Sequence, residues 1–159
     1  MLNSQSLLVQ NLLSEMDLND SQLEELFNPK DKVMNDEAFE VMSEFFKSAD
    51  RLIICGDYDC DGVSATSIAY LLAKKLGKDV GYYIPNRLTE GYGVKSHTIQ
   101  MASDKGYTDV LIIDNGVKSH VEVELAQSLG MRLGIIDHHL ISDEIKADAF
   151  LHPDLLSVY

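Results

Sequence analysis

The stretch ICGDYDCDGVSAT, residues 54–66, places three carboxylates at alternate positions directly after an apolar run. They belong to Asp57, Asp59 and Asp61. Like charges at this spacing repel one another, and burying a carboxylate without a partner is costly. The stretch therefore predicts a strand that leads into a site where a metal ion, a basic partner or water holds the acidic side chains.

The same succession of an apolar run and a helix-like segment recurs after Asp50. Four runs have strand character: RLIICGD (51–57), DVGYYIP (79–85), DVLIIDNG (109–116) and MRLGIIDHH (131–139). Helices are predicted over 63–77, 93–106 and 119–130, each ending at a glycine, and AFLHP (149–153) is a candidate fifth strand. This alternation is typical of an α/β fold, a Rossmann-like parallel β-sheet with helices on both faces.

Residues 1–48 follow a helical pattern instead. Helices are predicted over 4–16, over 18–27 with Asp20 or Ser21 as its cap, and over 35–49 with Asn35 as its cap. We expect this N-terminal helical segment to pack on the core of an α/β domain formed by residues 49–159.

Composition narrows the classes of function. The formal charge is −13, from 13 basic and 26 acidic residues, which disfavours a simple nucleic-acid-binding module with a basic stripe. It leaves open an enzyme that reaches phosphates through metal ions. With two cysteines, no secretory signal and no run of about 20 apolar residues, the chain is expected to be cytoplasmic, without a membrane segment.

Acidic and imidazole groups follow three of the four apolar runs. Asp57, Asp59 and Asp61 follow the first, Asp114 the third, and Asp137, His138 and His139 the fourth. Taken alone, an aspartate at a strand end is most often a cap or turn residue, and a His-His pair is most often on the surface. The carboxyl ends of parallel strands meet at one crevice, however, so the coincidence favours a metal centre there. Carboxylates with imidazoles suit Mn²⁺, Mg²⁺, Zn²⁺ or Fe²⁺.

Four segments, in this order, resemble the first three motifs of the DHH phosphoesterases. They are GDYDCDGVSAT (56–66), IPNRLTEGYGV (84–94), IIDNGV (112–117) and IIDHHL (135–140). The GDYDxDG and PNRxxEGYG forms are similar to the branch of single-strand-specific 5′-to-3′ DNA exonucleases. The resemblance implies metal-dependent phosphodiester hydrolysis with Mn²⁺ or Mg²⁺, two ions in all, and single-stranded DNA as the substrate.

The resemblance also implies roles for individual residues. Asp59, Asp61 and His138 would be metal ligands, and Asp114 would bridge the two ions. His139 would contact the scissile phosphate, Asp137 would orient the histidines, Asp57 would support the cluster, and Arg87 would reach a phosphate of the strand.

Two further residues are candidates for substrate binding. Tyr92, between Gly91 and Gly93, is placed to stack on a base, and Ser64 lies near the N-terminus of the helix expected from Val63, where an anion fits. Helix capping is the alternative role for Ser64.

The sequence departs from the family pattern at two points. Cys55 stands where many members have a ligand histidine, and we expect it in the core. No segment before Tyr159 matches the fourth motif, which supplies another aspartate, and the linker and C-terminal domain are not found. A second polypeptide or such a C-terminal region is therefore an expected partner. Two alternatives stay open: a non-catalytic interaction protein with the DHH fold, and a phosphodiesterase of short oligonucleotides.

Overall fold

The computed structural model describes residues 11, 13, 15–16, 18–28 and 37–153. The chain forms two compact units, residues 1–33 and residues 34–159. Among the described residues, no helix combines the length and the apolar content that crossing a bilayer requires. The expected packing of the N-terminal segment on the core stays a prediction.

The first unit contains helix α2, Asp20–Phe27, and its cap differs from the prediction. Asn19, rather than Asp20 or Ser21, is the N-cap residue. Its side-chain oxygen accepts a hydrogen bond from Gln22 N (3.0 Å), and Gln22 Oε1 accepts one from Asn19 N (2.9 Å). This reciprocal capping box satisfies two backbone donors at once, which neither predicted residue could do from inside the helix. The helix expected over 4–16 lies largely outside the described residues, and so does Asn35, the expected cap of the helix over 35–49.

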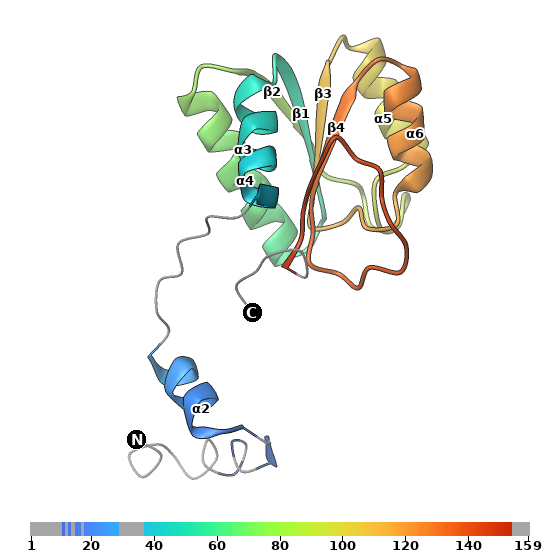
Figure 1. Cartoon of the computed structure of the whole chain (residues 1–159). Coiled ribbons are helices and arrows are strands. Elements are labelled where there is room, and N and C mark those ends of the chain that lie inside the picture. The colour runs from blue at the N-terminus through green and yellow to red at the C-terminus, as the bar shows by residue number, and fades with distance from the viewer. Residues whose placement is uncertain (1–10, 12, 14, 17, 29–36, 154–159) are drawn as a thin grey trace. The chain divides into compact units, whose positions relative to one another are not determined.

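The second unit is built on one parallel sheet, as predicted (Figure 1). Its strands are β1 (Arg51–Gly56), β2 (Asp79–Tyr83), β3 (Asp109–Ile113), β4 (Arg132–Ile136) and β5 (Ala149–Leu151). Their order across the sheet is β2-β1-β3-β4-β5, and all neighbouring pairs are parallel. The candidate fifth strand is confirmed.

Helices cover both faces of this sheet. α3 (Glu37–Ser48) and α4 (Cys60–Lys75) lie on one face, and α5 (Ser96–Asp104) and α6 (His120–Ser128) lie on the other (Figure 1). Successive side chains of a strand point to opposite faces. Leu52 and Ile54 of β1 accordingly join the core under α3 and α4, whereas Ile53 and Cys55 join the core under α5 and α6. Burial on both faces explains why β1, β3 and β4 are continuous apolar runs.

Helix α4 begins at Cys60, three residues earlier than the predicted start at Val63. Asp59 is its N-cap residue, and Asp59 Oδ1 accepts a hydrogen bond from Gly62 N at 3.2 Å. Cys60, which precedes the helix predicted over 63–77, is therefore helical. Gly62 is required here because a Cβ would lie 2.8 Å from Asp57 Cβ. The early start places Asp61 in the first turn of the helix.

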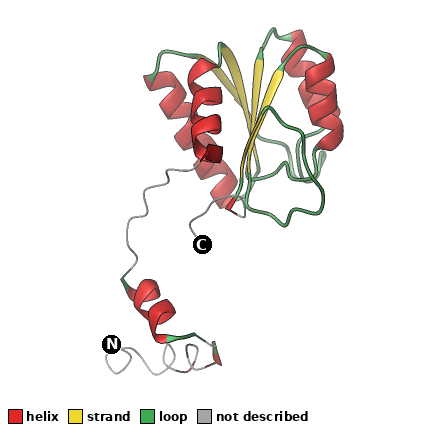
Figure 2. Cartoon of the chain, in the orientation of Figure 1, coloured by secondary structure: helices red, strands yellow, loops and turns green. Residues whose placement is uncertain are grey.

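The loops that follow the strands gather at one edge of the sheet (Figure 2). The chain passes from β1 to β2 on one side of β1, whereas β3 lies on the other side of β1. The carboxyl ends of β1 and β3 thus form the switch point at which open α/β sheets bind ligands.

Candidate metal centre

The loop after β1 holds two of the candidate acids close to the sheet. Asp57 is 2% exposed, and its Oδ1 accepts a hydrogen bond from Tyr58 N at 2.8 Å. Burial raises the pKa of Asp57, and the neighbouring charge of Asp59 raises it further. Asp59 caps α4 with one oxygen, so its second carboxylate oxygen is left for another partner.

Asp114 brings a carboxylate to the same place from the end of β3. It directly follows the last residue of the strand, its side chain is 8% exposed, and its backbone has a φ of 62°. Burial raises the pKa of Asp114, and the charges of Asp61 and Asp59 raise it further. A left-handed backbone at a residue other than glycine is uncommon and is often found at functional sites.

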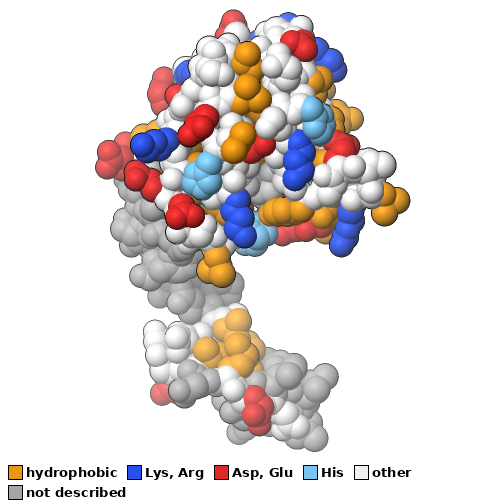
Figure 3. Space-filling view, turned by 90° about the vertical axis from the view of Figure 1, so that its right-hand side faces the viewer, with side chains coloured by type: hydrophobic (Ala, Val, Ile, Leu, Met, Phe, Trp, Pro, Cys, Tyr) orange, Lys and Arg blue, Asp and Glu red, His pale blue; other side chains and the backbone are white. Residues whose placement is uncertain are grey.

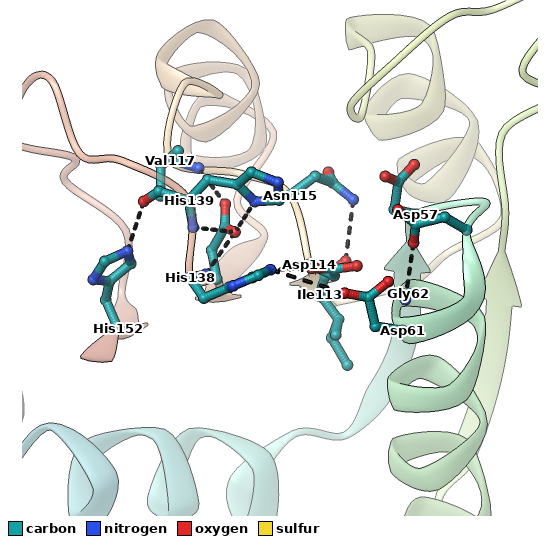
Figure 4. A network of polar contacts seen from close by, with 12 residues as sticks. Asp57, Asp61, Gly62, Ile113, Asp114, Asn115, Val117, His138, His139 and His152 are labelled. Carbon is teal, nitrogen blue, oxygen red and sulfur yellow. Dashed lines mark hydrogen bonds and ion pairs between the residues drawn. The ribbon is translucent and has the colours of Figure 1, made fainter. Parts of the chain in front are cut away.

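His138 closes the site from the loop after β4 (Figure 4). Its Nε2 lies 3.1 Å from Asp114 Oδ1 and 4.0 Å from Asp61 Oδ2. The structure therefore brings together groups from three loops that are far apart in the sequence, as the strand-end pattern predicted.

Two sets of side chains among the described residues could each hold a metal ion. Asp114, His138 and His139 form one set, and Asp57, Asp59 and Asp114 form the other, with ligand atoms in each set within 4.8 Å of one another. Asp114 belongs to both, which is the position expected of a bridging carboxylate. The second set contains Asp57, for which the resemblance implied only support, whereas Asp61 is exposed and approaches the site through His138.

Asp137 differs from the other acids in that hydrogen bonds satisfy both of its carboxylate oxygens. Its side chain is fully buried; Oδ2 accepts from Val117 N (3.0 Å), and Oδ1 accepts from His138 N (2.7 Å) and His139 N (3.2 Å). His139 Nδ1 also donates to Oδ1, at 2.7 Å. Although burial opposes it, hydrogen bonding from His139 and these amides lowers the pKa of Asp137, and the carboxylate in turn raises the pKa of His139. Asp137 thereby fixes the orientation of the loop and of the His139 ring.

Two positioning residues were missed by sequence reasoning. Asn115 is fully buried, its Oδ1 accepts from Val94 N at 3.3 Å, and its Nδ2 donates to Ile113 O at 3.1 Å. His152 Nε2 lies 2.7 Å from His139 O and anchors the loop that carries both histidines. The hydrogen bonds of the buried Asn115 amide link two segments that are separate in the sequence, and no sequence pattern pointed to them.

The expected substrate-binding residues lie at different distances from this cluster. The Tyr92 hydroxyl is 3.3 Å from His139 Nε2. The Arg87 guanidinium lies over the Tyr58 ring, 5.1 Å from its centroid, and so stands beside the first motif. Ser64 lies inside α4 rather than at its cap, and its hydroxyl donates to Cys60 O at 2.6 Å.

The donor set fits a hard or borderline divalent cation. Within residues 37–153, the ion-pair partners of Asp61 and Asp114 are histidine, and neither lysine nor arginine pairs with them. Among the described residues, the candidate donor sets contain carboxylates and imidazoles and no thiolate. Cys55 is buried in the core, where burial raises its pKa to about 12. Cys55 is thus a core residue, as expected. A cation would remove the like-charge repulsion at Asp114.

Comparison with known proteins identifies the family. The model of the DHH family, N-terminal domain, matches residues 51–158. The chain belongs to the DHH family. It is 35% identical over 122 residues to the single-stranded-DNA-specific exonuclease RecJ of Escherichia coli (strain K12) and 32% identical over 118 residues to that of Bacillus subtilis (strain 168).

Two solved structures of RecJ share the fold. The crystal structure of exonuclease RecJ bound to manganese is 30% identical, with a TM-score of 0.67 over 77% of this chain and 32% of that one. RecJ from Thermus thermophilus in complex with Mn²⁺ is 22% identical, with a TM-score of 0.65 over 82% of this chain and 19% of that one. The chain spans 21% of the length of the E. coli relative and 15% of the B. subtilis relative.

Proposed function

We propose that this chain carries the core of a metal-dependent phosphodiesterase that releases nucleotides from the 5′ end of single-stranded DNA. The observation that carries the proposal is the convergence of Asp57, Asp59, Asp114 and His138 from three loops. Within residues 37–153, neither lysine nor arginine pairs with the buried carboxylates of Asp57 and Asp114. The name of the relatives, single-stranded-DNA-specific exonuclease, supports this choice of substrate.

In this proposal Asp59, Asp61, Asp114 and His138 hold two divalent ions, Mn²⁺ or Mg²⁺, and Asp57 supports them. The two relatives solved with manganese favour Mn²⁺. When bound, such ions lower the pKa of water and stabilise charge on the attacking and leaving oxygens. The early start of α4 serves this arrangement, because one carboxylate group of Asp59 both caps the helix and faces the site.

His139 is proposed to contact the phosphoryl group. Its Nδ1 donates to Asp137, so Nε2 is the ring atom available to a substrate. The Asp137 carboxylate raises the pKa of His139, which supports a ring that carries a proton on Nε2 and donates it in a hydrogen bond to a phosphoryl oxygen. Asp137 is then a positioning residue that acts through His139.

Single-stranded DNA is proposed to cross the edge of the sheet between Arg87 and Tyr92. Arg87 would bind a phosphate, Tyr92 would stack on a base, and Ser64 would contact the strand from α4. A DNA substrate and two free thiols fit a cytoplasmic location. A second polypeptide or a C-terminal region would complete the site, since no segment of this chain matches the fourth motif.

Hydrolysis of 5′-phosphorylated single-stranded DNA in Mn²⁺ tests the proposal, with duplex DNA of the same sequence for comparison. We expect weak, Mn²⁺-dependent release of 5′ nucleotides from the single strand. Asp114→Asn is the matched variant, because asparagine tolerates the left-handed backbone at this position and removes only the charge. No release by the wild type, or equal release by the variant, would contradict the proposal.

A further inference from the structure

A second cavity lies next to the metal centre, on the α5–α6 side of His139. Its volume is about 520 Å³, and it lies between the loop that precedes α5 and the loop that joins β3 to α6. Tyr92 and His139 form the wall that it shares with the metal centre, while Lys95, Lys118 and Ser119 line the other side. Lys95, Lys118 and Ser119 have no part in the proposed metal centre or in the proposed contacts with the strand.

Ser119 is the first sign that this cavity takes a ligand. The residue is 7% exposed and lines the cavity. It occupies the N-cap position of α6, yet its side chain makes no cap hydrogen bond, and its hydroxyl has no hydrogen-bond partner in the part of the chain that the structure describes. An N-cap serine normally bonds to a backbone N–H of the first helical turn. The Ser119 hydroxyl is therefore available to a bound group.

The charges around the cavity favour an anion. Lys118 is exposed at its rim, and Lys95 Nζ donates to Tyr92 O at 2.7 Å, which holds this ammonium group at the wall. Lys95 and Ser119 are also the N-cap residues of α5 and α6, and neither side chain makes a cap hydrogen bond.

Glu122 is the one acidic residue in the wall, and its Oε1 accepts a hydrogen bond from Ser96 Oγ at 3.0 Å. Figure 3 shows this side of the molecule, where lysine and arginine side chains lie among histidines and carboxylates on the lower half of the α/β unit.

We propose that this cavity binds a phosphate group, held by the Ser119 hydroxyl, Lys118 and Lys95. Because His139 belongs to both sites, the phosphate would be one that neighbours the scissile phosphate on the same strand; this assignment rests on the proposed function. A strand could then be held at two adjacent phosphates, one at the metal centre and one in the cavity.

The test measures phosphate binding to the full chain without metal ions. The ¹⁵N-labelled protein in EDTA is titrated with inorganic phosphate at constant ionic strength, and the amide signals of Ser119 and His120 are followed. We expect saturable shifts at these amides. Ser119→Ala should weaken binding about threefold and Lys118→Ala about fivefold, as for hydrogen bonds to a charged group at a partly exposed site.

The controls separate the site from general charge effects. Lys105→Ala removes an exposed lysine from the loop after α5, outside the cavity, and should leave binding unchanged. Ser119→Ala breaks no cap hydrogen bond, so its melting temperature should match that of the wild type. Equal loss in Lys105→Ala and Lys118→Ala, or shifts that avoid Ser119 and His120, would overturn the proposal.

Thymidine oligonucleotides with and without a 5′ phosphate identify the source of the group. Tighter binding of the phosphorylated strand assigns the cavity to the terminal phosphate, and equal binding assigns it to an internal one. Failure of either strand to compete with inorganic phosphate would overturn the link to a nucleic acid. Since no metal is present, the result is independent of whether the chain hydrolyses DNA.

Discussion

Asp109 and Asp114 are buried carboxylates at opposite ends of one strand, β3, and they have opposite surroundings. Asp109, at the amino end, accepts hydrogen bonds from Arg132 Nε (2.7 Å), Thr108 Oγ1 (2.7 Å) and Asp50 N (3.0 Å). Asp114, just past the carboxyl end, has only His138 Nε2 as an ion-pair partner within residues 37–153. Burial raises the pKa of Asp114, and the charges of two further aspartates raise it more.

The difference separates a structural edge of the sheet from a functional one. At the amino edge the chain supplies its own cations, Arg132 for Asp109 and Arg51 for Asp79. At the carboxyl edge it gathers acids that pair with no lysine or arginine among residues 37–153, and we propose that cations from solution supply the positive charge there. Unpaired charge that lowers stability is retained where it serves binding.

The largest effect is expected at the amino edge. Asp109→Asn keeps the shape of the side chain but removes the charge that pairs with Arg132, so we expect a loss of about 2–3 kcal/mol in the free energy of unfolding. Urea unfolding followed by circular dichroism measures this loss.

Asp79→Asn is the matched control for that variant. It removes the carboxylate of an ion pair whose side chains are 42% and 67% exposed, and exposed pairs contribute about 0.5 kcal/mol or less. If Asp79→Asn cost as much as Asp109→Asn, the buried pair would not be the feature that stabilises this edge.

A smaller effect of opposite sign is expected at the carboxyl edge. In metal-free protein near neutral pH, Asp114→Asn should raise the free energy of unfolding by about 1 kcal/mol, the repulsion between two charges roughly 4 Å apart in water. The same urea experiment in EDTA measures it. A loss of stability would mean that the Asp114 charge is already compensated within the protein.

The smallest effect concerns Glu90, a carboxyl-edge acid that does have partners. Hydrogen bonding from the Tyr83 hydroxyl, and then from the Asn86 amide, lowers the pKa of Glu90. A lowered pKa stabilises the fold above the unfolded value of 4.5, and this contribution is lost as pH falls through the folded pKa.

Glu90→Gln should therefore lose less stability than the wild type on acidification from about pH 7 to about pH 3. Unfolding curves at a series of pH values provide the measurement. Identical pH profiles for the two proteins would show that these hydrogen bonds do not stabilise the ionised form.

Much of this architecture could be predicted because its determinants are local. The apolar runs of β1, β3 and β4 mark strands buried on both faces, and the acids that follow them mark one edge of the sheet. The start of α4 was missed because Asp59 has two roles, candidate metal ligand and helix cap. One aspartate in the sequence does not reveal that both roles fall on the same residue.

The positioning residues depend on contacts that no local pattern reveals. Asn115 bonds to Val94, 21 residues away, and His152 bonds to the His139 carbonyl, 13 residues away. Ser119 has the sequence of an ordinary N-cap, and only its unused hydroxyl distinguishes it. The ligand roles taken from the family motifs stay predictions until a metal is observed.

Titration with Mn²⁺ tests the central claim most directly, namely that the carboxyl edge is an acidic site completed by cations from solution. Electron paramagnetic resonance counts free and bound Mn²⁺ in the wild type, in Asp114→Asn and in Asp79→Asn. We expect about two ions to bind to the wild type and to Asp79→Asn, and Asp114→Asn to lose most of this binding. The absence of saturable binding at millimolar Mn²⁺, or equal binding by all three proteins, would contradict the claim.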